Sequence, residues 1–95
     1  MKLEFWQTVS CNHLTLAKVC KTIDWQQPLP RCGEYVAGLD TLDGEQELPV
    51  RKLLHRVQDG SCLAELPSFN IAQLRLSYRE LEQLAAKKGW TLQKL

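Results

Sequence analysis

The chain has 95 residues, which predicts a single domain that buries about 60–65% of the surface its unfolded form exposes. Hydrophobic residues make up 44% of the chain and charged residues 24%, and these ordinary globular values exclude a disordered or fibrous protein. The net charge of +1 excludes a protein that binds its partners through overall charge alone.

Alternating apolar and polar residues over positions 2–10 predict a half-buried strand, with Trp6 on its polar side. Four apolar residues then recur at the spacing of one helical face: Leu16, Val19, Cys20 and Ile23. This spacing predicts a helix with Asn12 as its N-cap. The helix should end near Trp25, because the two prolines that follow cannot continue it.

Strands are predicted at residues 34–39 and 50–58, and the second segment is enriched in branched side chains. Asp59-Gly60 predicts a two-residue hairpin turn, because both residues tolerate the positive φ angles that such a turn needs. The resulting register pairs His55 with Ala64 and Val57 with Cys62. The core face then carries Leu53, His55, Val57, Cys62, Ala64 and Leu66.

Ser77 and Glu80 match a capping box, which predicts a helix that begins at Tyr78. The helix should end at Gly89, the preferred residue for the left-handed position after a helix, with Trp90 packing back on the last turn.

Residues 70–77 fit two structures. Leu74 and Leu76 alternate with polar residues, as in a strand, but the apolar spacing also fits one long helix from about residue 70. With either alternative, the elements predict an α+β fold. In this fold an antiparallel sheet of about four strands has the helix of the N-terminal half and the C-terminal helix packed on one face.

His55 and Cys62 are the candidates for thiol chemistry. In the predicted register they are diagonal neighbours, with Cβ atoms about 7 Å apart. The thiol would lie among apolar side chains, which disfavour the thiolate that a nucleophile needs. We therefore expect a buried thiol beside a hydrogen-bonded histidine, and a thiol- or metal-dependent enzyme that uses these two residues is an alternative.

Metal ligands are present but their spacing does not predict a site. The candidates are Cys11, His13, Cys20, Cys32, His55 and Cys62. Structural zinc sites usually present ligands in close pairs, and only Cys11 and His13 come near this pattern. No glycine-rich phosphate-binding motif occurs. We expect no metal and no cofactor.

Basic residues gather in the last third of the chain: Arg75, Arg79, Lys87, Lys88 and Lys94. The segment LSYRELEQLAAKKGWT resembles the first helix and turn of a helix-turn-helix motif. Only five residues follow Trp90, too few for the recognition helix of such a motif. A nucleic-acid-binding regulatory protein is therefore an alternative, with Arg75, Arg79, Lys87 and Lys88 as its contacts.

Two segments, PLPRCGEYVAGL and VRKLLHRVQDGSCLAELP, resemble small uncharacterised proteins encoded by the mobile gene cassettes (integron cassettes) of bacteria. The shared features are structural turn signals and include no catalytic residue. The resemblance implies an oligomeric protein with no assigned activity.

The leading prediction is a non-enzymatic binding or protein-interaction module. Apolar residues on both faces of residues 50–57 predict that a second subunit covers one face, as a homodimer or higher homo-oligomer. The interface candidates are Trp6, Leu54 and Leu63, since aromatic and aliphatic anchors dominate interface energetics. A different protein partner is also compatible with this surface.

We expect a cytoplasmic protein with no membrane partner. The first residues lack the basic segment and apolar stretch of a signal peptide, and no apolar run approaches bilayer length. Thiols stay reduced in the cytoplasm, so the four cysteines should form no disulfides.

Overall fold

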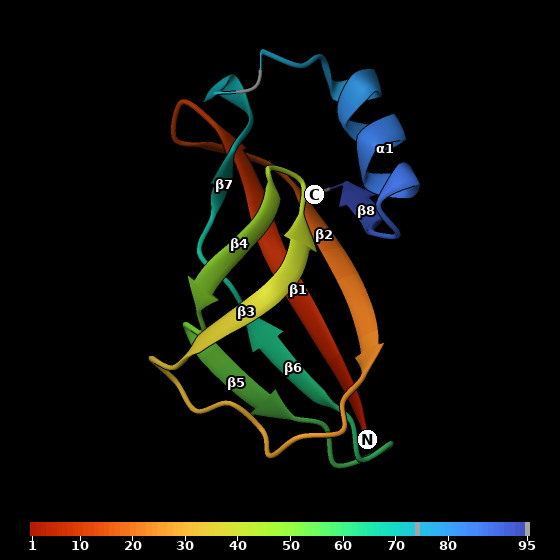
Figure 1. Cartoon of the computed structure of the whole chain (residues 1–95). Helices are drawn as coiled ribbons and strands as arrows, with labels where there is room; N and C mark the ends of the chain where they lie inside the picture. The colour runs from red at the N-terminus through yellow and green to blue at the C-terminus, as the bar shows by residue number, and fades with distance from the viewer. Residues whose placement is uncertain (74, 95) are drawn as a thin grey trace.

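The computed structural model describes residues 1–73 and 75–94, in which the main sheet has the strand order β5-β6-β1-β2-β8, with β7 beside β1 (Figure 1). Its strands are β1 (Lys2–Cys11), β2 (Leu14–Asp24), β5 (Lys52–His55), β6 (Cys62–Glu65), β7 (Phe69–Asn70) and β8 (Thr91–Lys94). A separate hairpin contains β3 (Tyr35–Thr41) and β4 (Gly44–Pro49). The helical segments are the 3₁₀ turn η1 (Ile71–Gln73) and the helix α1 (Tyr78–Lys87).

The helix predicted around residues 16–23 is wrong, because this segment is strand β2, paired antiparallel with β1. Asn12 is not an N-cap. Asn12 and His13 have φ angles of 48° and 70°, as required in the two-residue turn that joins the strands. The helical spacing arose because β2 carries apolar residues on both faces: Val19 points to the core, and Cys20, next in the chain, points to the opposite face.

The main sheet is mixed, so the predicted antiparallel sheet of about four strands is also wrong. β1 lies between antiparallel β2 on one side and the parallel strands β6 and β7 on the other. Parallel neighbours need a long crossover connection, and here residues 25–51 carry the chain from β2 to β5 on the other side of β1. The prediction of two helices on one face is also wrong. Within residues 1–73 and 75–94, α1 is the only helix longer than one turn.

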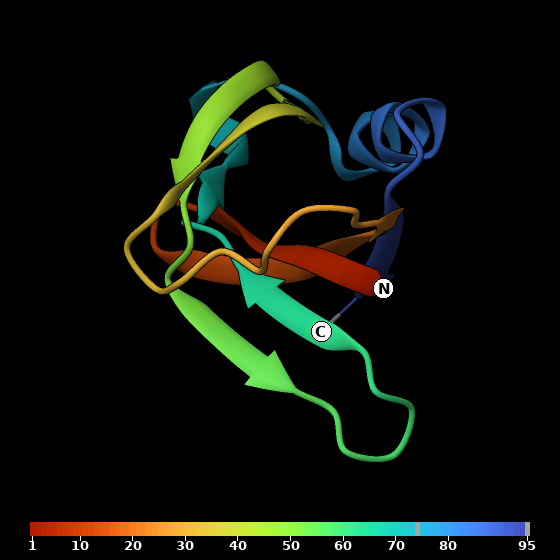
Figure 2. The same ribbon diagram turned by 60° about the horizontal axis from the view of Figure 1, so that its bottom comes forward.

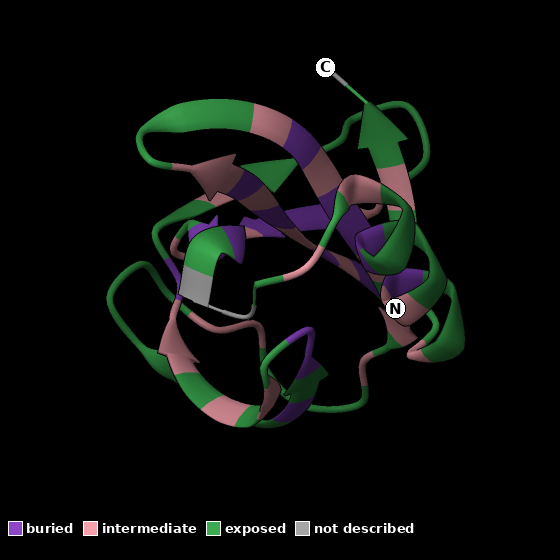
Figure 3. Cartoon of the chain, turned by 90° about the horizontal axis from the view of Figure 1, so that it is seen from above, coloured by how far each residue is buried: buried purple, intermediate pink, exposed green. Residues whose placement is uncertain are grey.

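The β3–β4 hairpin and α1 cover the same face of the main sheet (Figure 2), which we call the inner face. From β1, Leu3, Phe5 and Val9 point to this face and are 0% exposed. Side chains from the covering layer complete the core: Val36, Leu39, Leu81, Ala85 and Trp90. Buried segments accordingly lie where sheet, hairpin and helix meet (Figure 3).

The β5–β6 connection differs from the two-residue turn predicted at Asp59-Gly60. The Arg56 N–H donates to the Ser61 carbonyl at 2.8 Å, and the Gly60 N–H donates to the Arg56 carbonyl at 3.0 Å. The chain therefore reverses over residues 57–60. The Asp59 carboxylate accepts hydrogen bonds from the hydroxyl and backbone N–H of Ser61 at 2.7 and 2.9 Å, and these bonds lower the pKa of Asp59.

This longer loop changes the strand register. His55 lies opposite Cys62 and Leu53 opposite Ala64, so the predicted pairing of Val57 with Cys62 and His55 with Ala64 is wrong. The shift is two residues, which is the side-chain period of a strand, and it therefore leaves the faces unchanged. Cys62 and Ala64 are buried on the inner face as predicted, whereas Val57 lies in the loop and is 97% exposed.

The predicted start of the C-terminal helix is confirmed. The Ser77 hydroxyl accepts the Glu80 N–H, and the Glu80 carboxylate accepts the Ser77 N–H, both at 3.2 Å. The helix begins at Tyr78. The long helix from about residue 70 is wrong, since Ile71–Gln73 is a 3₁₀ turn and α1 begins at Tyr78; Leu74, the centre of the strand alternative, lies outside the described residues.

The predicted helix end is also confirmed. The Trp90 N–H donates to the Ala85 carbonyl at 2.8 Å and the Gly89 N–H donates to the Ala86 carbonyl at 3.2 Å. With Gly89 at a φ of 81°, this pair of bonds is the Schellman motif. The Trp90 indole N–H donates to the Asp40 carbonyl at 2.9 Å and so ties the helix end to β3.

Candidate functional site

The three predicted interface residues share the outer face of the main sheet, the face opposite the hairpin and α1. Trp6 points outward from β1, and Leu54 and Leu63 lie opposite each other on β5 and β6. Leu54 is 42% exposed, Trp6 is half-buried and Leu63 is 9% exposed. Among the described residues, no helix or hairpin covers this face (Figure 2).

Charges of both signs are interspersed with these apolar side chains. The Arg56 guanidinium forms an ion pair with the Glu4 carboxylate at 3.2 Å. Lys52 and Glu65 lie opposite each other on β5 and β6. The outer face therefore combines apolar and paired polar side chains, as protein–protein interfaces do.

Trp6 and Cys20 lie opposite each other at the centre of the outer face. The Lys18 ammonium lies 5.1 Å from the centre of the Trp6 ring, a cation–π distance. The indole N–H is buried and has no acceptor among the described residues. Burial raises the pKa of the Cys20 thiol, and the nearby Glu4 carboxylate raises it further. Cys20 therefore stays protonated and contributes to the apolar part of this face.

The second candidate site joins the two residues proposed for thiol chemistry. The two residues lie directly opposite each other and not diagonally as predicted, and the Cys62 Sγ lies 3.3 Å from the His55 Nδ1. Because Arg56 and Ser61 are a hydrogen-bonded pair, the next pair along the ladder is non-hydrogen-bonded, the type in which facing side chains approach most closely. Cys62 is 2% exposed, whereas His55 is exposed.

The cysteines and histidines considered as candidate metal ligands are dispersed. Across residues 1–73 and 75–94, no three His, Cys, Asp or Glu side chains come close enough to hold a metal ion. All four cysteines are free: Cys20 and Cys62 are buried, Cys11 is half-buried and Cys32 is exposed. Among the hydrogen bonds of the described residues, only the one between Cys62 and His55 joins two of the candidate ligands.

The basic residues proposed for nucleic acid do not form one free surface. The Lys88 ammonium forms an ion pair with Asp40 at 3.1 Å and is thereby joined to the acidic β3–β4 hairpin. Arg75 precedes α1 and has a φ of 53°. Arg79 and Lys87 are exposed on the helix. The acidic hairpin thus offsets the positive charge at the end of the helix, where a phosphate backbone would have to bind.

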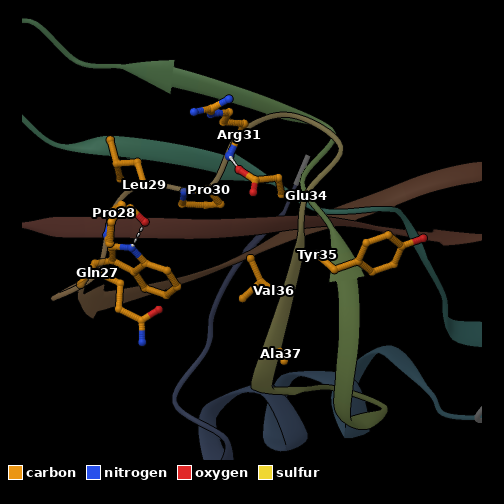
Figure 4. A pocket seen from close by; sticks show the side chains of 10 residues that line it. Gln27, Pro28, Leu29, Pro30, Arg31, Glu34, Tyr35, Val36 and Ala37 are labelled. Atoms are coloured by element: carbon orange, nitrogen blue, oxygen red, sulfur yellow. Dashed lines mark hydrogen bonds between the residues drawn. The ribbon is translucent and has the colours of Figure 1, made fainter.

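The structure also contains a recess that the sequence did not predict, lined by Trp25 and residues 27–31 and 34–37 (Figure 4). Its volume is about 630 Å³. The Trp25 indole N–H donates to the Pro28 carbonyl at 3.1 Å, which fixes the proline-containing loop as one wall. The only sequence signal was a tryptophan followed closely by two prolines. The lining combines aromatic rings with the Arg31 side chain, but many of these residues are exposed and no polar group converges on the centre.

Comparison of the chain with protein-family models, curated proteins and solved structures gave no match. The helices within the described residues are too short to cross a membrane.

Proposed function

We propose that this chain is a non-enzymatic protein-interaction module that binds a second copy of itself through the outer face of the main sheet. The observation that supports this function is the position of Trp6, Leu54 and Leu63 on a face that no other described element covers. The proposal includes a cytoplasmic location, because four free thiols are usual in a reducing compartment.

The charge pattern of the outer face favours a second copy as the occupant. A two-fold interface brings the same patch together from both subunits, so the patch must complement itself. Lys52 and Arg56 lie on the edge strand side, Glu4 and Glu65 lie on β1 and β6, and Lys18 lies beside Trp6. Two copies related by a two-fold axis can therefore exchange the ion pair of Arg56 with Glu4 within each chain for the same pair across the axis.

The resemblance of residues 28–39 and 50–67 to cassette-encoded bacterial proteins supports the same proposal, since it implies an oligomer. Nucleic-acid binding is less well supported, because the ion pair of Lys88 with Asp40 engages one of its four candidate residues.

Replacing Leu54 with glutamate is expected to raise the dimer dissociation constant at least about 100-fold, because a charge would be buried without a partner on both sides of the axis. Size-exclusion chromatography with light scattering, over a range of protein concentrations, measures the change. We expect the mass of a dimer for the unmodified chain and the mass of a monomer for Leu54→Glu.

Val57→Glu is the matched control, since it introduces the same charge at an apolar residue of the same hairpin that is 97% exposed in the loop. This variant should remain dimeric. A monomeric unmodified chain at millimolar concentration, or a Leu54→Glu variant that dimerises as well as Val57→Glu, would show that the outer face does not bind a second copy.

A further inference from the structure

A thiol and an imidazole are in contact at the edge of the main sheet, on the inner face and away from the proposed interface. The Cys62 Sγ and His55 Nδ1 are 3.3 Å apart, within the range of a hydrogen bond that involves sulfur. The two strands that hold them are adjacent, and the residues lie directly opposite each other. Neither residue takes part in the outer face, because the side chains of β5 and β6 alternate between the two faces.

We propose that Cys62 is a modifiable thiol that His55 activates for exchange with low-molecular-weight disulfides. In the first step, the His55 Nδ1 accepts the proton of the Cys62 thiol. The thiolate Sγ then attacks one sulfur of the disulfide, so that a new S–S bond forms and the original S–S bond breaks. The leaving thiolate takes the proton from His55. Cys62 ends as a mixed disulfide, and one half of the small disulfide is reduced to a thiol.

The environments of the other cysteines distinguish Cys62 from them. Cys20, also buried, lies beside the Glu4 carboxylate, which together with burial keeps its thiol protonated. Within residues 1–73 and 75–94, Cys62 is the one cysteine whose sulfur has a nitrogen base at hydrogen-bond distance. A neighbouring base is what converts a weak thiol nucleophile into a reactive one.

Access to the sulfur depends on strand β5. This strand has four residues and lies at the end of the sheet, where β6 is its only neighbour in the strand order. The loop that follows it is solvent-exposed through residues 56–60. Short edge strands of this kind open locally at low free-energy cost. His55 is itself solvent-exposed, so a small outward movement of this strand end would admit a small reagent to the Cys62 sulfur while the imidazole stays beside it.

The test is the rate at which each cysteine of the intact chain reacts with 4,4′-dithiodipyridine, resolved by mass spectrometry of the labelled peptides. In the unmodified chain, Cys62 is expected to react at least about tenfold faster than Cys20, which is also buried, given the contribution of a positioned base. A Cys62 rate no higher than the Cys20 rate would overturn the proposal without any variant.

His55→Gln is expected to slow the reaction of Cys62 by about 10- to 100-fold, with no change at the exposed Cys32. His13→Asn is the control, because His13 is the only other histidine and asparagine tolerates its positive φ. An unchanged or faster rate at Cys62 in His55→Gln would mean that the imidazole only covers the sulfur. A faster reaction of Cys20 in that variant as well would mean that the substitution unfolds the chain. The ratio of the Cys62 and Cys20 rates in the unmodified chain would then decide the proposal.

Discussion

Replacing Phe5 with alanine is expected to lower the free energy of unfolding by about 3–5 kcal/mol. Phe5 is 0% exposed and points inward from β1, the strand with neighbours on both sides. Its ring packs edge-on against Trp25, with 5.9 Å between the ring centres, so truncation removes contacts with both the sheet and the loop that crosses it.

Urea denaturation followed by circular dichroism measures this loss. Val57→Ala is the control, because the side chain is 97% exposed and its truncation should change the free energy of unfolding by less than about 0.5 kcal/mol. A loss of less than about 1 kcal/mol for Phe5→Ala would show that the inner face of β1 is not the centre of the core.

Replacing Trp90 with alanine is expected to cost about 3–5 kcal/mol as well, for a different reason. Trp90 follows α1 and is 3% exposed, and its indole N–H donates to the Asp40 carbonyl of β3 at 2.9 Å. The Lys21 ammonium lies 5.7 Å from the centre of its ring. One side chain therefore joins the helix end, the hairpin and β2.

Trp90→Phe separates the hydrogen bond from the packing. This variant keeps an aromatic ring but leaves the Asp40 carbonyl without its donor, which should cost about 1–3 kcal/mol. Hydrogen exchange of the amides in residues 35–49 should accelerate in both variants, because the hairpin loses the indole hydrogen bond and keeps only the ion pair of Lys88 with Asp40 at this end of the helix. Unchanged exchange in this segment would contradict the proposed role of Trp90.

Local signals predicted the parts of the fold that depend on neighbouring residues. The alternation in β1, the capping box at Ser77 and the glycine at position 89 each reflect backbone chemistry within a few residues. The faces of β5 and β6 were also predicted correctly, because the period of two survives a two-residue change in register.

The errors arose where distant contacts decide the structure. β2 has apolar residues on both faces, so its sequence imitates a helical stripe, and its pairing with β1 overrides that local preference. At the β5–β6 loop, the Asp59 side chain bonds to Ser61, which favours a wider loop than the two-residue turn. The parallel pairing of β6 with β1 joins segments about 60 residues apart and left no local signal.

The same difference between local signals and distant contacts explains which features of the candidate sites the sequence predicted. The sequence placed Trp6, Leu54 and Leu63 on outward-facing positions, and this follows from alternation alone. It placed Cys62 and His55 as diagonal neighbours and not directly opposite each other, because the pairing depends on the loop length. The recess beside Trp25 was also missed, since a folded loop without periodicity forms its wall.

The pairing of Leu54 with Leu63 and the contact of Cys62 with His55 depend on the register of β5 against β6, and nuclear Overhauser effects between Hα protons report that register. In a non-hydrogen-bonded antiparallel pair the Cα atoms are about 4.5 Å apart, so the two Hα protons give a strong cross-peak. We expect cross-peaks between His55 and Cys62 and between Leu53 and Ala64. Cross-peaks between Val57 and Cys62 and between His55 and Ala64 would instead establish the two-residue turn and separate the thiol from the imidazole.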